Sequence, residues 1–148
     1  MKTAYIACPL LLVLSAALAA PAMSANPPAA QAAATQKAAA DATVIPLIVK
    51  ELADFPGKEV EMLTVEYAPG ASSGSHRHNA HTFVYVLEGS VVMQVEGGKE
   101  TTLGPGGTFY ESPDDVHTVS RNASNTSPAR FLVFFLKDKG APGTVPVH

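Results

Sequence analysis

The amino-acid sequence predicts one all-β domain, folded as a double-sheet jelly roll or a small barrel. Short runs of apolar or alternating residues recur from residue 44 onward, and glycine, proline or aspartate closes each run. No stretch repeats its apolar residues with the 3.6-residue period of an amphipathic helix, and only a turn near Leu52 is compatible with helix. A chain of 148 residues accommodates a single domain with terminal extensions.

Residues 1–25 have the layout of a secretory signal peptide, which is removed from the mature protein. Lys2 gives a positive start, residues 4–20 are almost uninterrupted apolar sequence, and small residues follow. A membrane anchor would need about 20 apolar residues in a stiffer run, and Pro9 and Pro21 argue against one. We therefore expect an exported protein, periplasmic or extracellular, that has no membrane association after cleavage.

Residues 26–43 form an Ala- and Pro-rich zone without an apolar stripe, which we interpret as a flexible linker. The barrel is expected over residues 44–140, followed by a Gly- and Pro-rich C-terminal tail at 141–148. This leaves one modest core and no second domain. The predicted strands are 44–49, 59–67, 82–87, 90–95, 100–103, 107–112, 116–121 and 130–136.

Charge and cysteine content exclude several classes of protein. The chain has 10 Lys and Arg against 13 Asp and Glu, and no basic run. A net charge of −3 gives no electrostatic reason to bind nucleic acid or an anionic membrane. Cys8 is the single cysteine, which excludes a disulfide scaffold and a cysteine-rich zinc module.

Two of the predicted strands, 82–87 and 130–136, carry apolar residues on both faces. A barrel interior covers only one face of each strand, so something else must cover the other. We expect a homodimer in which a second subunit supplies this cover. Cover by residues 44–56 of the same chain is the simpler alternative.

Three of the five histidines fall within six residues, at His76, His78 and His81. Residues two apart on a strand project from the same face, so the rings of His76 and His78 lie together. Two such imidazoles are a natural pair of ligands for a transition metal, but they need a third. His117, delivered after the turn at Pro113, is the candidate, and its alternative role is that of a hydrogen-bonded core histidine.

The spacing of these residues resembles the first sequence motif of the cupin family. That motif is a glycine, five residues, two histidines one residue apart, three or four residues, a glutamate, six residues and a second glycine. Gly70, His76, His78 and Gly89 match it with every spacing kept, and Thr82 stands where the glutamate belongs.

The second cupin motif is also recognisable, with two departures. Gly107, Pro113 and Asn122 have the family's spacing, whereas Asp115 replaces a glycine and His117 arrives one residue early. The resemblance implies a cupin double-stranded β-helix, a jelly-roll barrel that spans the whole folded domain.

The resemblance further implies a metal held inside the barrel by three histidines and a glutamate. His76, His78 and His117 match ligand positions, but Thr82 is a poor ligand. Three arrangements stay open. The metal keeps three histidines and leaves its other positions to water or substrate; His81 turns inward through a bulge at the strand start; or Glu111 reaches in from across the barrel.

A site of neutral imidazoles favours Zn, Ni, Cu or Fe(II) over Mn or Mg, which prefer oxygen ligands. Open coordination positions suit catalysis, and imidazole must be deprotonated to bind, so metal should be lost below about pH 6. The identity of the divalent transition metal stays open.

The cupin fold hosts many functions, so the fold alone does not choose among them. The first hypothesis is an exported metal-dependent enzyme, of oxygenase or isomerase type, for a small oxygenated or aromatic molecule. The second is a non-enzymatic periplasmic module that binds a metal or a small ligand, and the third is a structural barrel with a vestigial site. No nucleotide-binding loop, nucleophile elbow or helical zinc motif is present.

Overall fold

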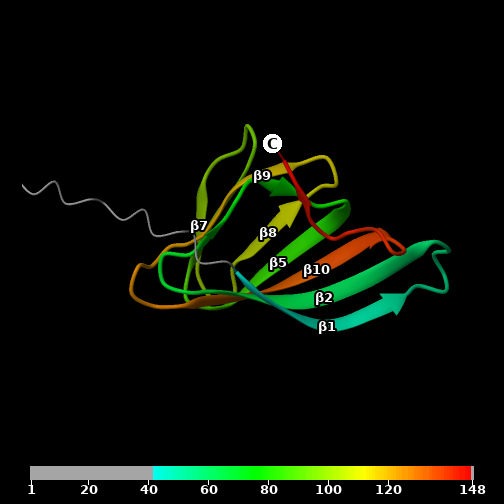
Figure 1. Ribbon diagram of the computed structural model, residues 1–148, viewed down its shortest axis with the longest axis horizontal. Coiled ribbons are helices and arrows are strands. Elements are labelled where there is room, and N and C mark those ends of the chain that lie inside the picture. The colour runs from blue at the N-terminus through cyan, green and yellow to red at the C-terminus, as the bar shows by residue number, and fades with distance from the viewer. Residues whose placement is uncertain (1–41, 148) are drawn as a thin grey trace, which may run out of the picture. The chain divides into compact units, whose positions relative to one another are not determined.

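The computed structural model describes residues 42–147, and every predicted strand is present within them (Figure 1). The expected signal peptide, 1–25, and nearly all of the expected linker, 26–43, lie outside this range. The elements are β1 (Thr43–Glu51), β2 (Lys58–Tyr67), β3 (Ser72–Ser73), β4 (His76–Arg77), β5 (Ala80–Glu88), β6 (Val91–Val95), β7 (Thr101–Leu103), β8 (Thr108–Glu111), β9 (Val116–Asn122), β10 (Ala129–Asp138) and β11 (Val145–Pro146).

The strands form two antiparallel sheets, which confirms the predicted all-β class. One sheet has the order β1-β2-β10-β5-β8, and Figure 1 shows these strands side by side. The other has the order β11-β4-β9-β6-β7, with β3 also paired to β9. In the described part of the chain no helix is found, so the region after Leu52 is a turn, and no segment has the helical length and hydropathy to cross a bilayer.

The core lies on the inner faces of both sheets. Strand β5 alternates regularly between buried and exposed residues, as expected for a strand with one face in a core. Each fully buried Val, Leu or Phe stabilises the fold by about 1.5–3 kcal/mol. The larger core side chains are Leu63, Val65, Tyr67, Val84, Val86, Val91, Met93, Phe131, Val133 and Phe135.

The outer face of the first sheet is apolar and open to solvent in the described chain. Phe83, Tyr85 and Leu87 of β5 are between 41% and 48% exposed. Strand β1 does not cover this face, because it pairs with β2 at the edge of the sheet and is exposed along its whole length. The alternative of cover by residues 44–56 is therefore wrong.

The barrel continues into the segment expected as a tail. Strand β11 pairs with β4, so that Val145 lies opposite Arg77 and Pro146 opposite His76. The buried Lys137 ammonium is paired with Glu59 and donates a hydrogen bond of 2.8 Å to the carbonyl oxygen of Ala141. These contacts fasten residues 141–146 to the domain, which composition alone could not indicate.

Candidate metal centre

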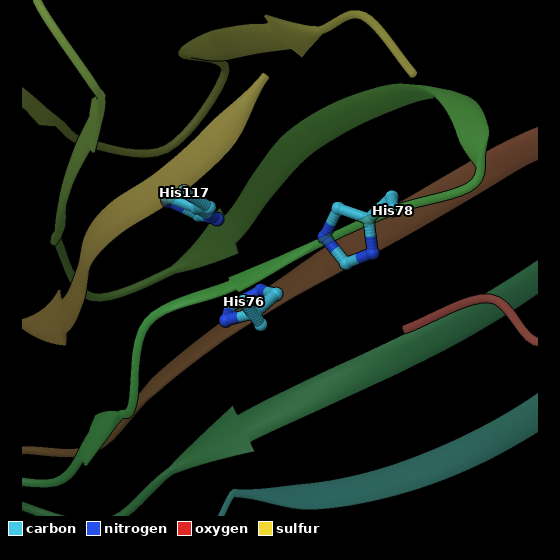
Figure 2. A group of neighbouring side chains, drawn as sticks. All are labelled: His76, His78 and His117. Atoms are coloured by element: carbon cyan, nitrogen blue, oxygen red, sulfur yellow. The ribbon is translucent and has the colours of Figure 1, made fainter. Parts of the chain in front are cut away.

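Three histidines meet where β4 and β9 pair. His76 of β4 is the register partner of His117 of β9, and His78 follows β4 by one residue. One ring nitrogen from each histidine lies within 4.8 Å of the others, and Figure 2 shows the rings around a common space. His78 and His117 are buried, and His76 is partly buried. The structure thus brings together the three histidines that the sequence singled out.

Backbone carbonyls determine which nitrogen of two rings faces that space. Nδ1 of His76 lies 2.7 Å from the carbonyl oxygen of Gly74, and Nδ1 of His78 lies 2.7 Å from that of Gly143. A carbonyl oxygen only accepts, so each Nδ1 carries the proton and donates it. In the neutral ring Nε2 then keeps its lone pair, which is the usual arrangement of a metal-binding imidazole.

Burial keeps these two rings neutral. Desolvation lowers the pKa of His76 and of His78 below the ordinary value of 6.5, because the charged form loses its hydration. The nearby Glu111 carboxylate opposes this shift and does not outweigh it. A neutral imidazole is the form that binds a metal.

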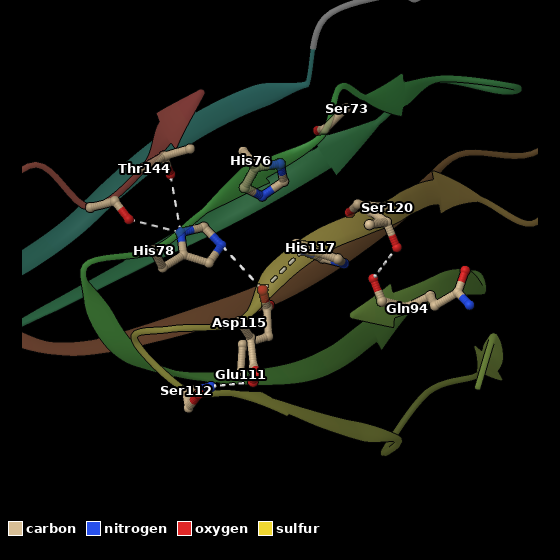
Figure 3. Close-up of polar contacts among 12 residues, drawn as sticks. Ser73, His76, His78, Gln94, Glu111, Ser112, Asp115, His117, Ser120 and Thr144 are labelled. Atoms are coloured by element: carbon tan, nitrogen blue, oxygen red, sulfur yellow. Dashed lines mark hydrogen bonds and ion pairs between the residues drawn. The ribbon is translucent and has the colours of Figure 1, made fainter. Parts of the chain in front are cut away.

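A carboxylate joins the three histidines. Glu111 of β8 is 1% exposed, and its Oε2 lies 3.1 Å from Nδ1 of His117 and 3.7 Å from Nε2 of His78. Figure 3 shows it between the two rings. The sequence left three arrangements open. This placement of the carboxylate corresponds to the third, in which Glu111 reaches in from across the barrel.

Several buried polar atoms of this cluster make no hydrogen bond to any described residue. They are both carboxylate oxygens of Glu111, both ring nitrogens of His117 and Oγ1 of Thr82. Each such group costs about 1–3 kcal/mol when it is left unsatisfied, and native proteins rarely gather them without a reason. Imidazole nitrogens and a carboxylate form a donor set that fits a transition metal.

His81 is not part of the cluster, which corrects the prediction that it is a metal ligand. It is exposed on the outer face of β5, and its Nδ1 lies 2.8 Å from the hydroxyl of Tyr110. The strand pairs regularly at this end, with His81 opposite Leu136 and Thr82 opposite Phe135. Because no bulge interrupts the alternation, Thr82 faces inward and His81 faces outward.

A cavity of about 460 Å³ adjoins the histidines. Its walls are largely apolar, from the inner faces of β2, β5, β6 and β10. One polar feature stands apart from the histidine cluster: the hydroxyl of Tyr67 lies 2.6 Å from Oγ of Ser73 and 2.8 Å from Oγ of Ser120. Burial raises the pKa of Tyr67, so its hydroxyl stays protonated.

This hydroxyl trio, Tyr67, Ser73 and Ser120, was missed from the sequence. Its three hydroxyls carry three protons, and two hydrogen bonds join them, so one O–H is left to donate to a molecule in the cavity. The alternation of 59–67 places Tyr67 inward, but nothing in the sequence pairs Ser73 with Ser120, which are register partners in β3 and β9.

Comparison with known proteins gives a family and several structural relatives. A family model described as "Cupin domain" matches residues 63–135. An oxalate oxidase solved with the substrate analogue glycolate is 26% identical, with a TM-score of 0.52, and the match covers 70% of this chain and 54% of that chain. No curated protein matches the sequence.

Two further structures show the same fold at lower identity. The DMSP lyase DddQ from Ruegeria pomeroyi DSS-3 is 22% identical with a TM-score of 0.51, covering 58% of this chain and 42% of the lyase. A Klebsiella pneumoniae protein with a double-stranded β-helix domain is 15% identical with a TM-score of 0.56, covering 74% of this chain and 89% of that one. The chain therefore spans about half or less of the two enzymes it resembles.

Proposed function

We propose a function from the premise that the chain belongs to the cupin superfamily. Its barrel binds a divalent transition metal through His76, His78 and His117, and it acts on a small oxygen-bearing molecule held in the adjoining cavity. The observation that carries the proposal is the convergence of three imidazoles at the wall of a cavity of about 460 Å³, where both ring nitrogens of the buried His117 make no hydrogen bond to a described residue.

The donor set favours Zn, Ni, Cu or Fe(II), because imidazole suits these ions better than Mg. When bound, such a metal supplies Lewis-acid polarisation of a substrate oxygen. The chain itself holds the imidazoles in place: the carbonyls of Gly74 and Gly143 fix the rings of His76 and His78. The buried pair of Lys137 and Glu59 anchors the segment that carries Gly143.

The substrate class follows from the two polar ends of the cavity. His117 and Ser120 are three residues apart on β9, a distance of about 10 Å along a strand. The walls between the two ends are apolar. A matching ligand has an oxygen function at the histidine cluster, an apolar or aromatic middle, and an acceptor for the spare O–H of the hydroxyl trio.

The oxalate oxidase that is 26% identical to this chain was solved with glycolate, a small oxygen-rich acid, which supports an oxygenated substrate. A cavity of about 460 Å³ is larger than a two-carbon acid requires and lies within the range of about 300–1,000 Å³ typical of small-molecule sites. We therefore propose oxygenase or isomerase chemistry on a larger hydroxy acid or phenolic compound.

The test is a turnover screen of metal-loaded protein against hydroxy acids and phenols, with oxygen consumption and product formation both recorded. Turnover that is lost in His78→Ala supports the enzyme. Metal binding together with saturable ligand binding but no turnover overturns the enzymatic part and leaves a periplasmic binding module. A protein that takes up no metal overturns the proposal and leaves a structural barrel.

We propose a homodimer joined through the outer face of the first sheet. Phe83, Tyr85 and Leu87 present a contiguous apolar surface there, and no described segment of the same chain covers it. An isologous dimer buries the same patch of both copies, as most homodimers do. The sedimentation mass of residues 42–148 tests this without the N-terminal segment.

We also propose that residues 1–25 direct export, on the strength of the charged start, the apolar run and the small residues that follow. N-terminal sequencing of the mature protein tests the proposal. A start after Ala19, Ala22 or Ala25 supports it, and an intact Met1 in the exported fraction, or retention in the cytoplasm, contradicts it.

A further inference from the structure

We infer that Glu111 is the fourth ligand of the metal, supplied by β8 instead of by the motif position that Thr82 occupies. The inference rests on the proposed metal site. The ligand set is then three imidazoles and one carboxylate instead of three imidazoles alone. The carboxylate adds a negative charge to the site and raises its preference for metals that accept an oxygen ligand.

The strand pairing explains how residue 111 can replace residue 82. Thr82 of β5 and Glu111 of β8 are direct register partners, and both side chains are buried on the inner face. Cβ atoms of directly opposed residues lie about 4.5–5.5 Å apart. A carboxylate from either position therefore reaches the same part of the barrel, and Thr82 leaves it room.

The distances fit a shared metal. With metal–ligand bonds of about 2.0–2.2 Å, two adjacent ligand atoms on one ion lie about 2.8 to 3.6 Å apart in octahedral or tetrahedral geometry. The 3.1 Å from Oε2 of Glu111 to Nδ1 of His117 lies within this range, and the 3.7 Å from Oε2 to Nε2 of His78 lies just beyond its upper end. Nε2 is the nitrogen of His78 that faces the cluster, because Nδ1 of the same ring is hydrogen-bonded to the carbonyl oxygen of Gly143.

The charge of Glu111 requires a partner that the described chain does not give it. Its carboxylate is 1% exposed, neither oxygen makes a hydrogen bond within residues 42–147, and its ion-pair contacts there are to His78 and His117. Burying an unpaired carboxylate is costly, and a divalent cation at this point compensates it directly.

A positioning role is the competing explanation. In that case Glu111 would only orient the ring of His117 from behind, as carboxylates do behind many metal-bound histidines. The 3.7 Å approach to the cluster-facing nitrogen of His78 argues for the ligand role, because a carboxylate behind His117 need not come near that atom.

The experiment titrates the metal-free protein with Zn(II), Co(II) and Mn(II) alone, by competition with a chelating dye, and records the Co(II) absorption spectrum. The variants are Glu111→Gln, the exchange Thr82→Glu/Glu111→Thr, and Glu100→Gln as a control at an exposed carboxylate paired with Arg121. Glu111→Gln should weaken affinity by more than about 100-fold, beyond the 10- to 100-fold typical of a residue behind a ligand. Mn(II) should lose most, because it prefers oxygen.

The exchange variant separates the two roles. If Glu111 is a ligand, the exchange Thr82→Glu/Glu111→Thr should restore the Co(II) spectrum and recover metal affinity to within about 10-fold of wild type. A 10-fold loss of affinity corresponds to about 1.4 kcal/mol of binding free energy. Glu111→Gln with unchanged affinity and spectrum overturns the inference while the three-histidine site stands. A wild-type protein that binds none of the three metals overturns the proposed function as well.

Discussion

Replacing the buried carboxylate Glu111 with leucine should stabilise the metal-free protein. The side chain is 1% exposed, and neither of its oxygens makes a hydrogen bond within residues 42–147. Leaving such a group unsatisfied costs about 1–3 kcal/mol, and leucine removes it at similar volume beside a cavity with room to spare. We expect Glu111→Leu to raise the free energy of unfolding by about 2 kcal/mol, which is about 8 °C in Tm for a domain of this size.

Thermal and urea unfolding followed by circular dichroism in the presence of a chelator measures the effect. Glu100→Leu is the matched control, because Glu100 is half exposed and paired with Arg121 on the surface. It should change stability by no more than about 0.5 kcal/mol. If Glu111→Leu instead lowers stability by more than about 1 kcal/mol, the carboxylate is satisfied without metal and the reasoning is refuted.

The order should reverse when metal is added. At a free metal concentration of 100 times Kd, binding stabilises the wild-type protein by about 2.7 kcal/mol, and a variant that binds poorly gains little. If the wild-type protein stays less stable than Glu111→Leu in saturating Zn(II), the proposal that Glu111 is a metal ligand is contradicted.

Three further predictions concern the fold and the assembly. Gly89→Ala should lower the unfolding midpoint far more than Gly97→Ala. Both glycines have positive φ, but a Cβ at residue 89 collides with backbone atoms whereas a Cβ at residue 97 meets open space. The hydrogen bond from Lys137 lowers the pKa of Glu59 below its ordinary 4.5. The contribution of Glu59 to folding stability is therefore complete above pH 4.5 and is lost as the pH falls through the lowered pKa. Glu59→Gln should make the urea midpoint depend less on pH between about pH 5 and pH 3, and an unchanged slope would refute this. Leu87→Glu should convert the dimer to a monomer in sedimentation with the circular dichroism spectrum kept, and an unchanged mass would exclude this face as the interface.

The eight longer strands could be predicted because each has a local signal. Alternation or an apolar run marks the strand, and glycine or proline marks its end. The short strands β3, β4 and β11 have no such signal. Two residues are too few to show a period, and their pairing depends on partners far along the chain, as Val145 depends on Arg77.

The histidines of the candidate site could be predicted from the sequence, but the placement of Glu111 could not. The spacing of His76, His78 and His117 is written in the sequence, and the structure brings these residues together. The position of Glu111 depends on the register between β5 and β8, which no local pattern determines. The prediction for His81 was wrong because it needed a bulge, whereas the strand alternates without interruption there.

The central claim is that the barrel holds one divalent metal through its histidine cluster. Elemental analysis of the protein, purified without a histidine tag and without chelators, tests it most directly. The account predicts close to one metal ion per chain in the wild type and in His81→Ala, since His81 lies outside the cluster, and little or none in His76→Ala. A wild-type protein that is empty and refuses added Zn, Ni and Fe(II), or a His76→Ala variant that keeps its full metal content, would contradict it.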